Sequence, residues 1–144
     1  METNSKETGK VYQRLHEKGV ADEQFVKGIY TRYKQRTYTL DKKWFVGKEC
    51  LDVGCGGQGS MIVGLLSLGV QKVYAIDIGS DWIGGLRKVL ENHNVLESIY
   101  ELKQSDVLNV PYKDERFDFV SINGVLIHLN NMAEIVRGFS EGAK

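Results

Sequence analysis

The sequence predicts an α/β domain built on a parallel sheet, and three observations support this prediction. Apolar segments typical of strands alternate with amphipathic helical segments between residues 49 and 140. An acidic residue and a cluster of glycines, residues 52–59, stand where the first strand should turn into a helix. Further acidic residues follow the second and third predicted strands. Because strands separated by helices form parallel units with right-handed crossovers, the carboxyl ends of the strands should meet at one edge of the sheet, where ligands bind.

The expected elements follow in chain order from the spacing of apolar residues. Strands are expected at residues 49–53, 72–77, 98–103 and 117–123. A first helix is expected at residues 60–68 and should end at Gly69. A second helix should follow Ser80, its expected N-cap, and a third is expected at residues 130–140. Gly84 and Gly85 cost the second of these helices about 1 kcal/mol each relative to alanine. We expect these two glycines to allow close packing or to loosen the first turns of the helix.

A helical segment is expected ahead of the sheet. Apolar residues recur at helical spacing from Asp22 to Tyr33, so residues 1–40 are assigned to an N-terminal helical segment and residues 41–144 to the main domain. Residues 27–48 carry seven basic side chains against one acid, Asp41, with tyrosines between them. That composition suits single-stranded nucleic acid. A solvated helix face whose tyrosines pack on the core is the favoured interpretation.

The composition argues against several classes of function. The chain carries 19 basic and 19 acidic residues, so it has no strong overall field for nucleic acid or an anionic membrane. Its two cysteines, Cys50 and Cys55, do not have the arrangement of a disulfide framework or a zinc site. We therefore expect no metal and a reducing, cytoplasmic setting. No signal peptide is expected, and the apolar runs are too short to span a bilayer.

The glycine-rich turn after the first strand indicates the class of ligand. Gly54, Gly56 and Gly59 match the G-x-G-x-x-G pattern of dinucleotide-binding turns, in which glycines let the backbone approach the ligand closely. Asp52, two residues before the first glycine, changes this interpretation. Its carboxylate would repel the pyrophosphate of NAD, whereas it would attract the ammonium group of S-adenosylmethionine. The charge therefore favours S-adenosylmethionine over a nicotinamide cofactor.

Two further acids extend the predicted site. Asp77 ends the second strand, where a carboxylate can accept hydrogen bonds from both ribose hydroxyls of a nucleoside; the alternative is a helix-capping or surface aspartate. Asp106 and Val107 follow the third strand, where a side-chain acceptor and a backbone N–H can recognise the amino edge of adenine. Asp106 alone is weak evidence, because turns favour aspartate. Acids at the ends of three successive strands together predict a nucleoside site.

With these residues the chain resembles the class I S-adenosylmethionine-dependent methyltransferases. The matching segments, in the family's order, are residues 51–56, 73–77, 105–107 and 117–129. The resemblance implies a Rossmann-like α/β sheet of order 3-2-1-4 with helices on both faces, preceded by one or two helices. It also implies a role for each site residue. The methionine end of the cofactor is held by Asp52 and the backbone of Gly54, Cys55, Gly56 and Gly57, the ribose by Asp77, and the adenine by Ile78, Asp106 and Val107, while Asn123 and Gly124 lie near the sulfonium and the substrate.

Two features depart from the family pattern. Gln58 stands where the third glycine of the turn is often found, and Gly59 follows one place later, which leaves the shape of this loop open. Family members usually have seven strands, whereas this chain ends after the helix that follows the fourth, so the domain is expected to be incomplete in its C-terminal part. An unpaired fourth strand would expose its ladder. The alternatives are a truncated protein, a second chain that covers this edge, or N-terminal helices folded over it.

His128, in the segment after the fourth strand, is a candidate general base, although a histidine there is often structural or lines the substrate pocket; no catalytic residue is assigned. Methyl transfer needs mainly the alignment of nucleophile, methyl carbon and sulfur in a dry pocket. We therefore expect methyl transfer to a small-molecule acceptor by in-line displacement. The alternatives are a cofactor-binding fragment or non-catalytic partner subunit and, with less support, an NAD-dependent oxidoreductase. The absence of Asn-Pro-Pro-Tyr after the fourth strand counts against an amino-directed DNA methyltransferase.

Overall fold

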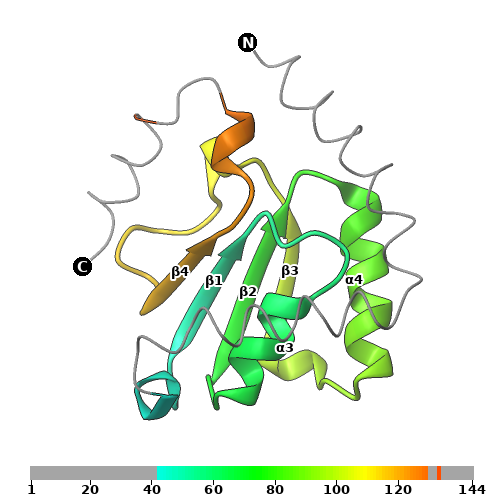
Figure 1. Cartoon of the computed structure of the whole chain (residues 1–144), viewed down its shortest axis with the longest axis vertical. Helices are drawn as coiled ribbons and strands as arrows, with labels where there is room; N and C mark the ends of the chain where they lie inside the picture. Colours follow the sequence, from blue (N-terminus) through cyan, green and yellow to red (C-terminus); the bar gives the residue numbers. More distant parts are fainter. Residues whose placement is uncertain (1–41, 130–132, 134–144) are drawn as a thin grey trace.

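The computed structural model describes residues 42–129 and Ala133. These residues contain a four-stranded sheet of order β3-β2-β1-β4, in which every neighbouring pair is parallel (Figure 1). The strands are Glu49–Val53 (β1), Lys72–Asp77 (β2), Tyr100–Gln104 (β3) and Phe119–Ile122 (β4). The predicted α/β class and the 3-2-1-4 order are confirmed. The expected N-terminal segment 1–40 and the expected helix at 130–140, apart from Ala133, lie outside the described residues.

Two α-helices of the described region connect the strands: α3 (Ser60–Ser67) follows β1, and α4 (Ser80–Asn92) follows β2. The prediction of Ser80 as N-cap was wrong, because Gly79 takes that position in an extended conformation. The Oδ1 atom of Asp77 accepts the N–H of Gly79 at 2.9 Å, which keeps the chain extended up to this glycine. Among the residues that the structure describes, a Cβ at Gly84 or Gly85 would meet nothing within 4 Å. Close packing within this part of the chain therefore does not explain these two glycines.

Short 3₁₀ segments account for the strand boundaries that the sequence did not predict. Those in the described region are η1 (Lys42–Phe45), η2 (Glu97–Ile99), η3 (Val107–Asn109) and η4 (Leu126–His128). In η2 the N–H of Ile99 donates to the carbonyl of Leu96 at 3.1 Å, so the chain still turns at 97–99 and β3 begins only at Tyr100. β4 is shorter than the predicted 117–123, because β1 offers it partners only from Cys50 to Val53.

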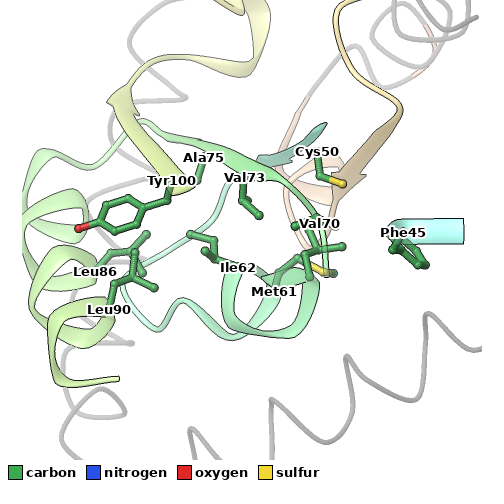
Figure 2. Packing of buried hydrophobic residues seen from close by; sticks show 11 residues of the cluster. Phe45, Cys50, Met61, Ile62, Val70, Val73, Ala75, Leu86, Leu90 and Tyr100 are labelled. Atoms are coloured by element: carbon green, nitrogen blue, oxygen red, sulfur yellow. The ribbon is translucent and has the colours of Figure 1, made fainter. Parts of the chain in front are cut away.

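The larger core lies between the sheet and the two helices, which pack on the same face. Figure 2 shows Leu86 and Leu90 of α4 beside Tyr100 of β3, and Ile62 of α3 near Val73 of β2. All five side chains are buried. β1 and β2 are the central strands and are covered on both faces, which explains why apolar residues from both faces of each strand, such as Cys50 and Leu51 or Val73 and Tyr74, are buried.

The opposite face of the sheet is covered in part by the loop between β3 and β4, residues 105–118. The buried strand residues of this face are Leu51, Val53, Tyr74 and Ile76, and the loop packs Val107, Val110, Tyr112 and Phe117 against them. Since successive side chains of a strand point to opposite faces, Asp52 and Asp77 lie on the side of the helices. Both acids stand at the carboxyl ends of the central strands.

Candidate functional site

The glycine-rich turn between β1 and α3 is fastened to the neighbouring strand β2. The N–H groups of Gly54 and Cys55 both donate to the carbonyl oxygen of Ile76, at 2.8 and 3.1 Å. Gly54, Gly56 and Gly59 have φ angles of 73°, 60° and 63°, a region that residues with side chains resist. The N–H groups of Gly54 and Cys55 are therefore already used inside the protein. At these two residues the turn offers a ligand close approach and carbonyl oxygens rather than N–H donors.

Replacing Gly54 with alanine is expected to destabilise the domain by about 2–4 kcal/mol, because it adds overpacking to the strain of a positive φ. A Cβ at Gly54 would overlap the Cγ2 methyl of Val125, whereas a Cβ at Gly56 would meet no atom of residues 42–129 and 133 within 4 Å. Gly56→Ala is the matched control and should cost only the backbone strain, about 1–2 kcal/mol. Urea unfolding of both variants, and of Gly54→Ala combined with Val125→Ala, measures the difference. Equal costs at both glycines, or no recovery in the double variant, would contradict the overlap.

Asp77, the last residue of β2, joins the glycine turn to the start of α4. Its Oδ2 atom accepts the N–H of Gly56 and its Oδ1 atom accepts the N–H of Gly79, each at 2.9 Å. The residue is 3% exposed. Burial raises the pKa of this carboxyl, and the N–H groups that it accepts lower it. A carboxylate has four acceptor positions, and the backbone N–H groups of Gly56, Gly79 and Ile78 all act on this one, so at least one position remains for a ligand.

Asp52 is the second buried carboxyl of the site and is 4% exposed. In the sheet it stands between Ala75 of β2 and Ser121 of β4. Burial raises the pKa of Asp52 to about 7; a hydrogen bond with the side chain of Ser121 lowers this pKa, and the charge of Asp77 raises it. Near neutral pH the carboxyl is therefore balanced between its neutral and charged forms. A cation placed beside it would favour the charged form.

Both cysteines are free thiols. Cys55 lies in the glycine turn, where burial first, and then the charges of Asp52 and Asp77, raise the pKa of its thiol well above the usual value. Burial likewise raises the pKa of Cys50, in β1, to about 12. Since the thiolate is the reactive form of cysteine, neither thiol is an activated nucleophile near neutral pH. Among residues 42–129 and 133, no group of three or more His, Cys, Asp or Glu side chains is arranged to hold a metal ion.

The turn after β3 lies beside the end of β2. The N–H of Ser105 donates to the carbonyl of Asp77 at 2.8 Å, which ties the turn to the neighbouring strand. Asp106 is the N-cap of η3, and its Oδ1 atom accepts the N–H of Leu108 at 3.0 Å. Asp106 therefore stabilises the turn through its own side chain, as aspartate often does. Val107 packs against the buried strand residues on the face of the sheet opposite the helices. The Asp106–Val107 turn is therefore fixed both by this packing and by its own backbone hydrogen bonds.

The other predicted residues flank these acids. Ile78 directly follows β2 and is half-buried, and its carbonyl accepts the side-chain amide of Gln104 at 3.0 Å. Asn123 directly follows β4, the strand beside β1, and is also half-buried. His128 ends η4, and its N–H donates to the carbonyl of Val125 at 3.0 Å. The sheet thus brings the predicted cofactor residues to one edge, at the ends of its neighbouring strands.

At the departure from the family pattern, Gln58 is followed by Gly59, the last residue before α3. Gly59 is the N-cap of α3 in a left-handed conformation, and the helix begins at Ser60. A Cβ at Gly59 would lie 2.5 Å from the Cδ1 methyl of Leu86, so the absence of a side chain lets this turn approach α4. Gln58 itself is 8% exposed, and its amide nitrogen has no hydrogen-bond partner in the part of the chain that the structure describes.

Two residues that shape the site were not predicted from the sequence. Ser121 contributes the side-chain hydrogen bond to Asp52, and Val125 fills the space above Gly54. The signal for Ser121 was a single polar residue within the apolar strand 119–122. No local signal marks Val125, because its contact with Gly54 depends on the pairing of β1 with β4.

Comparison with known proteins identifies the family. A family model described as "Methyltransferase domain" matches residues 51–141. The ubiquinone biosynthesis O-methyltransferase of Coxiella burnetii is 30% identical over 110 residues, which make up 76% of this chain and 42% of that protein. The chain therefore belongs to the methyltransferase-domain family, the class I S-adenosylmethionine-dependent methyltransferases that the sequence motifs indicate. The matched part covers 42% of the length of the curated relatives, so the chain spans less than half of them.

Solved structures share the fold. A putative S-adenosylmethionine-dependent methyltransferase from Methanococcus maripaludis matches with a TM-score of 0.70 at 19% identity, over 96% of this chain and 59% of that one. The [4+2]-cyclase SpnF matches with a TM-score of 0.71 at 18% identity, over 98% of this chain and 57% of that one. Within the described residues, the structure contains no helix with the length and apolar character that crossing a membrane requires.

Proposed function

We propose that this chain binds S-adenosylmethionine at the carboxyl ends of β1, β2 and β3 and transfers its methyl group to a small-molecule acceptor. The observation that carries the proposal is the pair of buried carboxyls, Asp52 and Asp77, beside a turn of left-handed glycines. Burying acids is costly to a fold unless they are paired, hydrogen-bonded or used by a ligand. Membership of the methyltransferase family supports the same cofactor.

The two carboxyls fit the two polar ends of this cofactor. Asp52, with its pKa raised to about 7, gains charge readily beside the positive sulfonium and ammonium groups. Asp77 keeps acceptor capacity beyond the backbone N–H groups of Gly56, Gly79 and Ile78, which suits a hydroxyl group of a ribose. The pyrophosphate of a dinucleotide would instead place negative charge against Asp52. This is the physical reason for preferring S-adenosylmethionine to NAD.

The remaining cofactor contacts are proposed from their places at the strand ends. Asp106 uses Oδ1 to accept the Leu108 N–H, so its other oxygen is the one proposed to accept the amino group of adenine. Val107 supplies the neighbouring N–H, and Ile78 packs on the adenine ring. The backbone of Gly54, Cys55, Gly56 and Gly57 lies along the methionine end, and Asn123 lies near the sulfonium.

When bound, S-adenosylmethionine supplies a methyl carbon whose sulfonium is already a good leaving group. The residues of this chain need to bind, orient and exclude water, since alignment in a dry site contributes most of the acceleration. Transfer would join the methyl carbon to the acceptor atom, and the electron pair of the broken carbon–sulfur bond would stay on sulfur. A hydroxyl acceptor also gives up a proton, and His128 is the candidate to receive it.

The acceptor and the activity of this chain remain part of the proposal. The Coxiella relative is named as an O-methyltransferase, so a hydroxyl is the first acceptor to test. Because the chain spans 42% of that relative, a cofactor-binding fragment or a non-catalytic partner subunit is the competing function. The fold alone does not choose between reactions, since a [4+2]-cyclase shares it.

Titration calorimetry of the purified chain with S-adenosylhomocysteine and with NAD tests the cofactor assignment. We expect binding of S-adenosylhomocysteine in the micromolar range and no comparable binding of NAD. A panel of phenolic, catecholic and amine acceptors, with S-adenosylmethionine labelled in its methyl group, then tests turnover. Binding without transfer to any acceptor would favour the non-catalytic subunit, and tighter binding of NAD would overturn the charge argument from Asp52.

We also propose how the chain is organised, following its sequence. Residues 1–40 form a helical segment ahead of a cofactor-binding domain at 41–144, and the free thiols support a cytoplasmic location.

Among the described strands β4 pairs only with β1, and its residues Phe119–Ile122 carry no charge that would protect an open edge. A second chain is proposed to cover this edge. Light scattering that reports the 16.3 kDa monomer at all concentrations would contradict it.

A further inference from the structure

Three aromatic side chains attach the loop 105–118 to the face of the sheet opposite α3 and α4. Tyr74 of β2 meets Tyr112 and Phe117 of the loop with ring centroids 5.5 and 5.1 Å apart, and the two loop rings are 5.0 Å from each other. We call these three residues the ring cluster. Tyr74 is 5% exposed, so the cluster stands on a buried base. Aromatic pairs at such distances stabilise a structure beyond the area that they bury.

Arg116 packs against the ring cluster and also contacts β1. Its guanidinium carbon lies 5.0 Å from the centre of the Tyr74 ring and 5.6 Å from that of Phe117. The same group donates to the hydroxyl of Tyr74 at 2.7 Å and forms an ion pair with Glu49 at 3.1 Å. Because the ion pair is partly exposed, it contributes little alone. The stacking and the hydrogen bond to a buried ring are the stronger contacts.

Tyr112, a member of the ring cluster, also contacts two residues of β3. Its hydroxyl donates to Glu101 at 3.2 Å, and the ammonium of Lys103 lies 4.8 Å from the centre of its ring. Lys103 also pairs with Glu101 at 2.8 Å. The loop is therefore attached to β1, β2 and β3 at once. Immediately before Arg116, the non-glycine residue Glu115 is held at a φ of 57°, a strained conformation that persists where surrounding contacts fix it.

The ring cluster and the proposed adenine turn belong to one packed unit. Val107 packs against the same cluster of buried strand residues as Tyr112 and Phe117, the cluster of Leu51, Val53, Tyr74 and Ile76. At its start the loop is tied to β2 by the Ser105 N–H, which donates to the carbonyl of Asp77 at 2.8 Å. A displacement of the ring cluster would therefore move the support beneath the Asp106–Val107 turn.

We propose that Tyr112 and Arg116 are positioning residues that hold the Asp106–Val107 turn in the geometry that distinguishes adenine from other purines. The inference rests on the proposed function and assigns to these residues a role away from the reacting atoms. Ordering a loop on binding weakens affinity, whereas a loop ordered in the free protein avoids that cost. A fixed turn also discriminates better, because an acceptor that cannot move is left unpaired by a ligand lacking the matching donor.

The test compares Tyr112→Leu and Arg116→Met with a control on the other core, Leu90→Val, which loosens the fold without touching the loop. Two quantities are measured: the affinity ratio between S-adenosylhomocysteine and S-inosylhomocysteine, which has oxygen in place of the adenine amino group, and hydrogen exchange at the Leu108 amide without ligand. We expect Tyr112→Leu and Arg116→Met to lower the ratio at least fivefold and to speed the exchange more than tenfold. Tyr112→Phe keeps the ring and should change the ratio less than twofold.

A merely structural role gives a different result. If Tyr112→Leu and Arg116→Met lower the unfolding midpoint as Leu90→Val does but leave both the affinity ratio and the Leu108 exchange unchanged, the positioning role is overturned. If the unaltered chain binds S-adenosylhomocysteine but does not prefer it to S-inosylhomocysteine, the inference fails while the proposed function stands. If the unaltered chain binds neither compound, the proposed function fails and this inference fails with it.

Discussion

Replacing Asp77 with alanine is expected to weaken the binding of S-adenosylhomocysteine by about 1–3 kcal/mol. Hydrogen bonds to a charged acceptor contribute about 1.5–3 kcal/mol each, and the variant removes the carboxylate that faces the proposed ribose. It also leaves the N–H groups of Gly56 and Gly79 without their acceptor, which should lower the free energy of unfolding by about 1–3 kcal/mol. Titration calorimetry measures the first effect, and urea unfolding without ligand measures the second.

Two controls separate the ribose contact from general damage to the site. His128→Ala changes a residue at the end of η4, remote in the chain from Asp77, and should leave cofactor binding nearly unchanged. Asp77→Asn keeps one acceptor oxygen and removes the charge, so its loss of affinity should lie between those of the other two variants. Equal losses from Asp77→Ala and His128→Ala would show that the cofactor has been placed wrongly.

The central strands could be predicted to the residue because their sequences carry unambiguous local signals. Both strands contain mainly apolar residues between charged ones and are buried on both faces. Gly54 follows β1 directly, and Gly79 lies two residues after the end of β2. The start of β3 could not be predicted in this way, since Ile99 and Tyr100 are equally good strand residues. Only the hydrogen bond from Ile99 to Leu96 places the boundary between them. Such a bond depends on the backbone path and leaves no trace in hydropathy.

The acids of the candidate site were predictable because their positions follow from the strands. Once β1 and β2 are parallel neighbours, Asp52 and Asp77 must stand near the same edge. The contacts that set their properties were not predictable, since Ser121 reaches Asp52 only through the pairing of β4 with β1. The same holds for the ring cluster, whose members Tyr74 and Tyr112 come from distant parts of the chain. Their aromatic contacts require the loop to fold back over the sheet.

Replacing Asp52 with asparagine is expected to stabilise the free protein at pH 8 by about 2–4 kcal/mol and to change its stability much less at pH 4. Burial raises the pKa of Asp52 from 3.8 to about 7, so between these values the folded protein holds a proton that the unfolded chain has released. Folding stability therefore falls as the pH rises through this window. Each unit of pKa shift corresponds to about 1.4 kcal/mol. Urea unfolding at both pH values measures the difference between the variant and the unaltered chain.

The Ser121→Ala variant tests the same balance from the other side. The hydrogen bond with Ser121 lowers the pKa of Asp52, so its loss should raise that pKa further and steepen the fall of stability with pH. Asp77, whose pKa burial also raises, should leave a residual pH dependence in Asp52→Asn. A stabilisation by Asp52→Asn that is equal at pH 4 and pH 8 would contradict the buried titration of this carboxyl.

Asp52→Asn should lose function as it gains stability, because the charge that costs the fold is the charge that a cationic ligand uses. S-adenosylmethionine carries a sulfonium, whereas the sulfur of S-adenosylhomocysteine is neutral. The variant should therefore weaken the binding of S-adenosylmethionine more than that of S-adenosylhomocysteine, by about 1–2 kcal/mol. In the unaltered chain, calorimetry near pH 7 in buffers of different ionisation enthalpy should show proton release on binding, as Asp52 gives up its proton to meet the cation. If Asp52→Asn binds both compounds as tightly as the unaltered chain does, Asp52 has no role in binding. Its burial would then lower the folding stability above pH 7 without any gain for a ligand.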